Sequence, residues 1–117
     1  MSTKAVTQVV EEYVAACQAG SVERLQAVFH PNALLSGYMQ GAWLMGDLQP
    51  FFDIVSNSPA PSADYSYQIS EVTVAGEVAS ARLDEENYLG MSFTDFFHLA
   101  KVDDRWQIIS KAFHVKT

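Results

Sequence analysis

Residues 93–113, FTDFFHLAKVDDRWQIISKAF, decide the fold, because they contain two long apolar-rich segments separated by one polar turn. Phe93, Phe97 and Leu99 share one face of the first segment if it is extended, since side chains alternate along a strand. Asp103-Asp104 is a turn signal between the two segments. The stretch therefore predicts an antiparallel β-hairpin.

Working back from this hairpin, the rest of the second half of the chain also predicts strands. Two further turn signals, Ala75-Gly76 and Leu89-Gly90, divide it into segments rich in β-forming residues. Because the turns are short, neighbouring strands should pair in antiparallel fashion. The expected meander has four strands, at residues 65–74, 77–88, 92–102 and 105–115.

The first half of the chain predicts helices. Val6, Val10, Tyr13 and Cys17 recur at helical spacing within residues 3–19. Gly20 should cap this helix, and Ser21 should begin a short second helix that ends at His30-Pro31. The remaining elements are expected to be a short strand at 33–39, turns at Gly41 and Gly46, a third helix capped by Asp47, and a loop at 56–64.

Composition bounds the function classes. The chain has 117 residues, 49% of them hydrophobic, which suits one domain spanning 1–117. Fourteen acidic against seven basic residues give a net charge of -7, which disfavours nucleic acid and anionic membranes as partners. The single Cys17, with no apolar leader and no bilayer-length apolar run, favours the cytoplasm.

The segments QVVEEYVAACQAGSVERLQAVFHPNALL (8–35) and FTDFFHLAKVDDRWQI (93–108) resemble the nuclear-transport-factor-2-like superfamily, which has a cystatin-like α+β fold. The second segment looks most like the small bacterial proteins described as putative lumazine-binding, and the first forty residues also resemble ketosteroid isomerase. This resemblance implies N-terminal helices packed on a strongly curved antiparallel sheet, a cone with an internal pocket, and homodimers through the outer sheet face.

Asp95 is the leading candidate for chemistry. Period-two alternation places it on the face of Phe93 and Phe97, where an isolated carboxylate is costly. It is either a neutral acid that donates a hydrogen bond to a ligand, or a structural acceptor satisfied by Lys111, Tyr13 or backbone donors. By resemblance, Tyr13 and Asp95 match the Tyr and protonated Asp of ketosteroid isomerase, which is a standard example of such a pair. The Tyr13 ring can equally serve only in packing.

A catalytic base is harder to find in the sequence. The segment that carries the isomerase's catalytic Asp reads Leu35-Ser36-Gly37-Tyr38, without a carboxylate, so isomerase activity is not expected. His114 is a candidate base whose direction depends on the register of the last strand, and the inward and outward directions stay open. His98 should face outward, opposite Asp95.

Cofactor and metal sites are not expected. The three His residues are scattered and no phosphate-binding or hydrolase motif occurs, so the expected cofactors and metals are none. Cys17 is interpreted as a buried, inert thiol. The acidic run Asp84-Glu85-Glu86 is interpreted as a solvated bend.

Two functions remain open. The first is a binding domain whose pocket holds a flat apolar or aromatic small molecule. The second is an enzyme like the superfamily's polyketide cyclases, dehydratases and isomerases, with Asp95 as acid and His114 as base. Phe96 and other outward residues would leave an apolar sheet face in water, which predicts a homodimer. The expected pocket residues are Tyr13, Met39, Met45, Phe51, Phe52, Tyr88, Phe93, Asp95 and Phe97.

Overall fold

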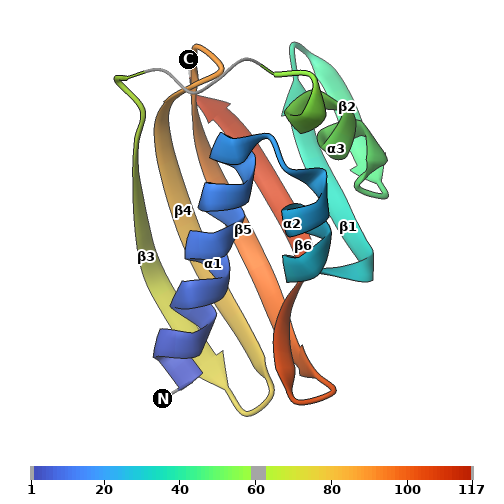
Figure 1. Ribbon diagram of the computed structural model, residues 1–117, viewed down its shortest axis with the longest axis vertical. Helices are drawn as coiled ribbons and strands as arrows, with labels where there is room; N and C mark the ends of the chain where they lie inside the picture. Colours follow the sequence, from blue (N-terminus) through green and yellow to red (C-terminus); the bar gives the residue numbers. More distant parts are fainter. Residues whose placement is uncertain (1, 59–62, 117) are drawn as a thin grey trace.

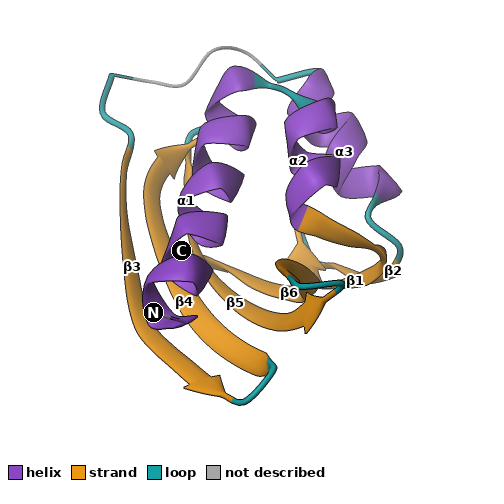
Figure 2. Ribbon diagram, turned by 60° about the horizontal axis from the view of Figure 1, so that its bottom comes forward, coloured by secondary structure: helices purple, strands orange, loops and turns teal. Residues whose placement is uncertain are grey.

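A computed structural model describes residues 2–58 and 63–116, so part of the loop expected at 56–64 lies outside the described residues. Three helices pack on one side of a curved, unclosed sheet of six strands (Figures 1 and 2). The expected α+β fold is thus confirmed, although the sheet does not close into a complete cone. The helices are α1 (Ser2–Ala19), α2 (Val22–Val28) and α3 (Gln49–Ser56).

The expected four-stranded meander is present as β3 (Ser66–Ala75), β4 (Val78–Tyr88), β5 (Met91–Val102) and β6 (Arg105–Lys116). Each of these strands pairs in antiparallel fashion with the next. Along β5, Phe93, Asp95, Phe97 and Leu99 are buried, whereas Phe96 is half exposed. The alternation in the sequence therefore placed this strand correctly.

The sheet is mixed, which corrects the expectation of a wholly antiparallel one. Strand β1 (Phe29–Met39) pairs in parallel with β6, and β2 (Ala42–Gly46) pairs in antiparallel fashion with β1. Strand β2 is not expected from the sequence, because Gly41 and Gly46 indicate turns at both of its ends. Strand β1 also begins earlier than expected: α2 ends at Val28, and the strand already includes His30-Pro31. Pro31 fits there because the pairing is irregular between residues 29 and 34.

Two caps hold the helices as the sequence indicates. Gly20 adopts a positive φ of 64° after α1, and the Ser21 N–H bonds back to the Ala16 carbonyl. At the start of α3, the Asp47 carboxylate accepts a hydrogen bond from the Gln49 N–H at 3.0 Å. In this arrangement α1 lies across the hollow side of the sheet, and α3 lies beside α2 (Figure 2).

An aromatic cluster joins the helices to the sheet. Tyr13 of α1 stacks on Phe51 of α3, with ring centroids 5.9 Å apart, and meets Phe97 of β5 edge-on at 5.0 Å. Phe29, at the start of β1, packs edge-on against both Tyr13 and Phe51. The cluster positions Tyr13, and with it one wall of the hollow between helices and sheet.

Trp106, in β6, is buried. We expect Trp106→Ala to lower the free energy of unfolding by about 3 kcal/mol or more, because the lost ring leaves a cavity in the core. Urea denaturation followed by circular dichroism measures this change. A loss below about 1 kcal/mol would contradict a structural role for the ring.

Candidate functional site

The hollow between the helices and the sheet contains an apolar cavity. Its unfilled space is about 500 Å³ including the open mouth, of which only about 40 Å³ can hold the centres of water-sized molecules. Every strand except β3 contributes to the lining, together with α1 and α3. The lining residues are Tyr13, Leu35, Met39, Leu44, Pro50, Phe51, Ile54, Glu85, Tyr88, Leu89, Phe93, Asp95, Lys111 and Phe113.

Most of the pocket residues expected from the sequence lie at this cavity. Tyr13, Met39, Phe51, Tyr88, Phe93 and Asp95 line it, and Phe97 packs behind Tyr13 without lining it. Phe52 lies at a separate surface hollow with Phe29 and His30. Met45 is 62% exposed and is not a lining residue. Its strand was missed in the sequence, so its direction could not be derived there.

Asp95 lies in the cavity wall and is only 1% exposed. Among the residues that the structure describes, neither of its carboxyl oxygens has a hydrogen-bond partner. Burial raises the pKa of Asp95, and the nearby Lys111 ammonium offsets this only in part. The Tyr13 hydroxyl lies close enough to lower the pKa of Asp95 slightly, but it is outside hydrogen-bonding geometry. A buried carboxyl without partners is costly as an anion, so this environment favours the neutral acid.

Glu85 was missed as a site residue. It is 2% exposed, lines the cavity, and accepts a hydrogen bond on Oε2 from the Tyr65 hydroxyl at 2.6 Å. Burial raises the pKa of Glu85 to about 7, and the neighbouring Asp95 carboxyl adds to this effect. The interpretation of Asp84-Glu85-Glu86 as a solvated bend is therefore wrong for Glu85, because these residues belong to β4 and alternate between its two faces.

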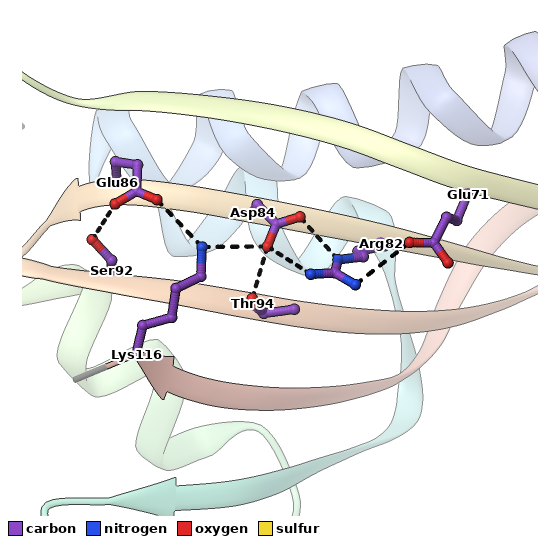
Figure 3. A network of polar contacts seen from close by, with 7 residues as sticks. All are labelled: Glu71, Arg82, Asp84, Glu86, Ser92, Thr94 and Lys116. Carbon is purple, nitrogen blue, oxygen red and sulfur yellow. Dashed lines mark hydrogen bonds and ion pairs between the residues drawn. The ribbon is translucent and has the colours of Figure 1, made fainter.

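The neighbours of Glu85 in sequence lie on the outer face of the sheet. Asp84 forms ion pairs with Arg82 and Lys116 and accepts a hydrogen bond from Thr94, within a polar network that also includes Glu86 (Figure 3). The Arg82 guanidinium holds the pKa of Asp84 down at about 2. Adjacent carboxyls on β4 thus have opposite pKa shifts because they face water and ion pairs on one side and the cavity on the other.

Lys111 brings a positive charge to the same cavity. It is buried, and its Nζ lies 3.6 Å from the Phe51 ring centroid and 5.2 Å from that of Tyr13. These rings stabilise the ammonium by cation–π attraction. From the sequence, Lys111 is expected only as a possible partner for Asp95. Within the described residues Lys111 forms no ion pair, and its side chain borders the cavity.

His114 does not join the site. It is exposed and pairs with Thr94, one position away from the Asp95–Phe113 pair, so it lies on the opposite face of the sheet. His114 therefore cannot act as a base at the cavity in this geometry, and of the two directions left open by the sequence it takes the outward one. His98 is exposed on the outer face, as expected.

The Cys17 thiol is buried in α1, and burial raises its pKa to about 12. The thiol is therefore protonated near neutral pH, which agrees with the interpretation of an inert side chain. In residues 2–58 and 63–116, no group of three His, Cys, Asp or Glu side chains is arranged to hold a metal ion. In the same residues, no helix is long and apolar enough to cross a membrane.

Comparison with known proteins identifies the family of this chain. The model of the family described as putative lumazine-binding matches residues 1–114. The chain belongs to this family. Among curated proteins, it is similar to the aldolase FrzH from a Cladobotryum species, with 31% identity over 103 residues that cover 87% of this chain and 82% of that one.

Solved structures agree with the family and its nuclear-transport-factor-2-like fold. An NTF2-like protein of unknown function from Shewanella baltica shares 29% identity and a TM-score of 0.89, covering 97% of this chain and 93% of that one. An NTF2-like protein of unknown function from Methylobacillus flagellatus shares 32% identity and a TM-score of 0.88, covering 97% of this chain and 91% of that one. The family assignment therefore describes the whole fold, including the strands that carry the cavity.

Proposed function

We propose that the protein binds a flat, mainly apolar small molecule in the cavity and orients it through Asp95. The observation that carries this proposal is the Asp95 carboxyl, which is buried at an apolar cavity with both oxygens unpartnered. Buried polar groups are almost always satisfied in folded proteins, so a ligand is the natural partner for this one. The family's description as lumazine-binding supports a small ring compound as the class of ligand.

The cavity suits a flat molecule because aromatic rings form its sides. Three parts of the fold contribute these rings: α3 provides Phe51, the β4–β5 hairpin provides Tyr88 and Phe93, and β6 provides Phe113. Rings of this kind stack on a flat ligand and gain contact area with little loss of side-chain freedom. Because only a small part of this hollow is open to water-sized molecules, we expect a small ligand of one or two rings, whose binding widens the mouth of the cavity.

A thermal-shift screen of flat one- and two-ring compounds tests this function, because a ligand that binds the folded state raises the melting temperature by mass action. For a compound that binds, we expect Asp95→Asn to retain more affinity than Asp95→Ala, since the amide can still donate a hydrogen bond. Circular dichroism checks that both variants fold. If the wild-type protein and Asp95→Ala bound the compound with equal affinity, Asp95 would not contact the ligand.

A second candidate is acid–base catalysis on a carbonyl compound, for which the Glu85 carboxyl is the favouring observation. A group with a pKa of about 7, beside an Asp95 carboxyl whose pKa is also raised, has the protonation behaviour of a general base near neutral pH. Glu85 would take the place that the sequence analysis gave to His114. The name of the relative FrzH, an aldolase, makes carbonyl chemistry the reaction class to examine first.

We also propose that the protein is a homodimer through an outer apolar patch formed by Leu34, Tyr38, Trp43, Met45 and Phe96, all exposed on the face away from the helices. Neighbouring exposed apolar side chains of this kind often mark an interaction site. The lone buried thiol suits a reducing compartment, and we propose the cytoplasm.

Light scattering should show a dimer at tens of micromolar, an approximate concentration at which weak interfaces saturate. Phe96→Asp should shift the protein to a monomer, because it places a charge in the patch. Ala27→Asp, on the exposed side of α2, adds the same charge elsewhere and should leave the dimer intact. A monomeric wild-type protein would rule the interface out.

A further inference from the structure

The geometry points to a specific ligand chemistry: we propose that Asp95 and Glu85 together bind the edge of a flat ring in which a carbonyl group stands next to an N–H group, as in a cyclic amide. This inference rests on the binding function proposed above and adds the chemical class of the ligand. It assigns Glu85 a direct role in binding, on the same edge as Asp95.

The two carboxyls lie on neighbouring strands of the cavity wall. Asp95 is opposite Leu83, and Glu85 is opposite Phe93, so Glu85 and Asp95 are diagonal neighbours on the same face of the sheet. The backbone positions of diagonal neighbours in an antiparallel pair lie about 7–8 Å apart, so their long side chains can approach each other. One small polar edge can therefore contact both groups.

The hydrogen-bonding capacities of the two carboxyls are complementary. In its protonated form, which burial favours, Asp95 has one O–H to donate, and no protein group accepts it among the described residues. Glu85 receives the Tyr65 hydroxyl on Oε2, a bond that favours its ionised form, and its Oε1 has no hydrogen-bond partner in the described part of the chain. The wall thus presents a donor beside an acceptor. A ligand carbonyl would accept from Asp95, and the adjacent N–H would donate to Glu85.

Other ligand types satisfy this wall less well. A simple ketone would accept from Asp95 but leave the Glu85 oxygen without a donor, and a buried polar group left unpaired weakens binding by its uncompensated desolvation. A cationic ligand would meet the Lys111 ammonium, which borders the same cavity. The cyclic amide edge satisfies both carboxyls without adding charge.

Binding through an ionised Glu85 makes the affinity depend on pH. A carboxylate accepts the ligand N–H more strongly than a protonated carboxyl does, so affinity should rise as the pH increases through about 7, where Glu85 loses its proton, and then level off. Several titratable groups influence Glu85 from the surrounding elements: Asp95 on β5, Lys111 on β6, Tyr13 and Cys17 on α1, Tyr88 at the end of β4, and Tyr65 just before β3.

The test uses 2-quinolone, a flat cyclic amide, and 1-methyl-2-quinolone, in which a methyl group replaces the N–H hydrogen. Isothermal titration calorimetry of the full chain measures both at pH 6 and pH 8. We expect 2-quinolone to bind about tenfold more tightly at pH 8 than at pH 6, because the ionised fraction of Glu85 rises by about this factor. At pH 8 we also expect 2-quinolone to bind about tenfold more tightly than its methyl derivative, a ratio typical of one hydrogen bond.

Variants separate the two carboxyls. Glu85→Gln should bind 2-quinolone with the same affinity at pH 6 and pH 8, because the amide oxygen still accepts but no longer titrates. Glu85→Leu should remove the preference for 2-quinolone over its methyl derivative, and Asp95→Leu should weaken both compounds equally. Glu86→Gln changes the next residue on the outer face and should behave as the wild-type protein.

The outcomes distinguish this inference from the proposed function. Equal binding of the two quinolones, or an affinity for 2-quinolone that does not change between pH 6 and pH 8, overturns the assignment of the edge while leaving the binding function in place. The same holds if neither quinolone binds but other flat compounds raise the melting temperature. If no flat compound binds at all, the proposed function fails, and this inference fails with it.

Discussion

At pH 8, Glu85→Gln should unfold at a higher urea concentration than the wild-type protein, and at pH 4 the two proteins should unfold at nearly the same concentration. The expected gain at pH 8 is about 3 kcal/mol, which corresponds to the difference between a pKa of 4.5 in the unfolded chain and about 7 in the folded protein. Few single substitutions stabilise a protein by this amount.

The sign follows from where the proton is held. Between pH 4.5 and about 7, the unfolded chain has lost the Glu85 proton while the folded protein retains it, so folding stability falls as the pH rises through this window. Above pH 7 the folded protein holds a buried carboxylate, and the full cost remains. Gln avoids this cost at every pH because its side chain does not ionise.

Glu86→Gln provides the matched control, since it removes a carboxylate one position away on the outer face. Its free energy of unfolding should not show a gain at pH 8, because Glu86 is exposed and bonded to Ser92 and Lys116. Denaturation is compared at one fixed protein concentration, so that dimerisation affects all samples alike. A gain for Glu85→Gln that is the same at pH 4 and pH 8 would contradict the raised pKa.

Gly37→Ala should destabilise the protein by about 3 kcal/mol and weaken ligand binding. Gly37 lies in β1 directly opposite Phe113 of β6, and a Cβ added there would lie 2.6 Å from both the Phe113 ring and its carbonyl oxygen. Overpacking of this kind costs about 1–3 kcal/mol, and the φ of 156° adds strain. Because Phe113 lines the cavity, its displacement changes the wall that contacts the ligand.

Gly46→Ala separates the clash from the strain. Gly46, at the end of β2, has a similar φ of 148°, but a Cβ there would meet no atom within 4 Å. Urea denaturation should therefore show a much smaller loss for Gly46→Ala, and calorimetry should show unchanged ligand affinity. Equal losses for the two variants would mean that backbone strain, and not the contact with Phe113, determines the effect.

The meander and the inward direction of Asp95 could be predicted because both follow from local patterns. Short turn signals separate the strands, and alternation along β5 assigns Phe93, Asp95 and Phe97 to one face regardless of the rest of the fold. The same rule would have found Glu85, since Ala81, Leu83 and Glu85 alternate along β4 and are all buried. The run of three acidic residues hid this signal, because charge runs usually face water.

Other features could not be read from local patterns. The parallel pairing of β1 with β6 joins segments near opposite ends of the sequence, and no turn signal specifies it. This pairing determines which residues of β1 face the cavity, including Leu35 and Met39. The direction of Met45 likewise depends on the pairing of β2 with β1, and the phase of His114 depends on the register of β6.

The position of β6 between β5 and β1 also has a consequence for the order of assembly. The hairpins of β3, β4, β5 and β6 form by closing short loops. Strand β1 can pair with β6 only after a long loop of chain has been closed, and this step is slower because it costs more conformational entropy. We expect the meander to form early and β1, β2 and α3 to dock onto its edge late. The cavity, which needs side chains from both groups, would then exist only once that last step of folding is complete.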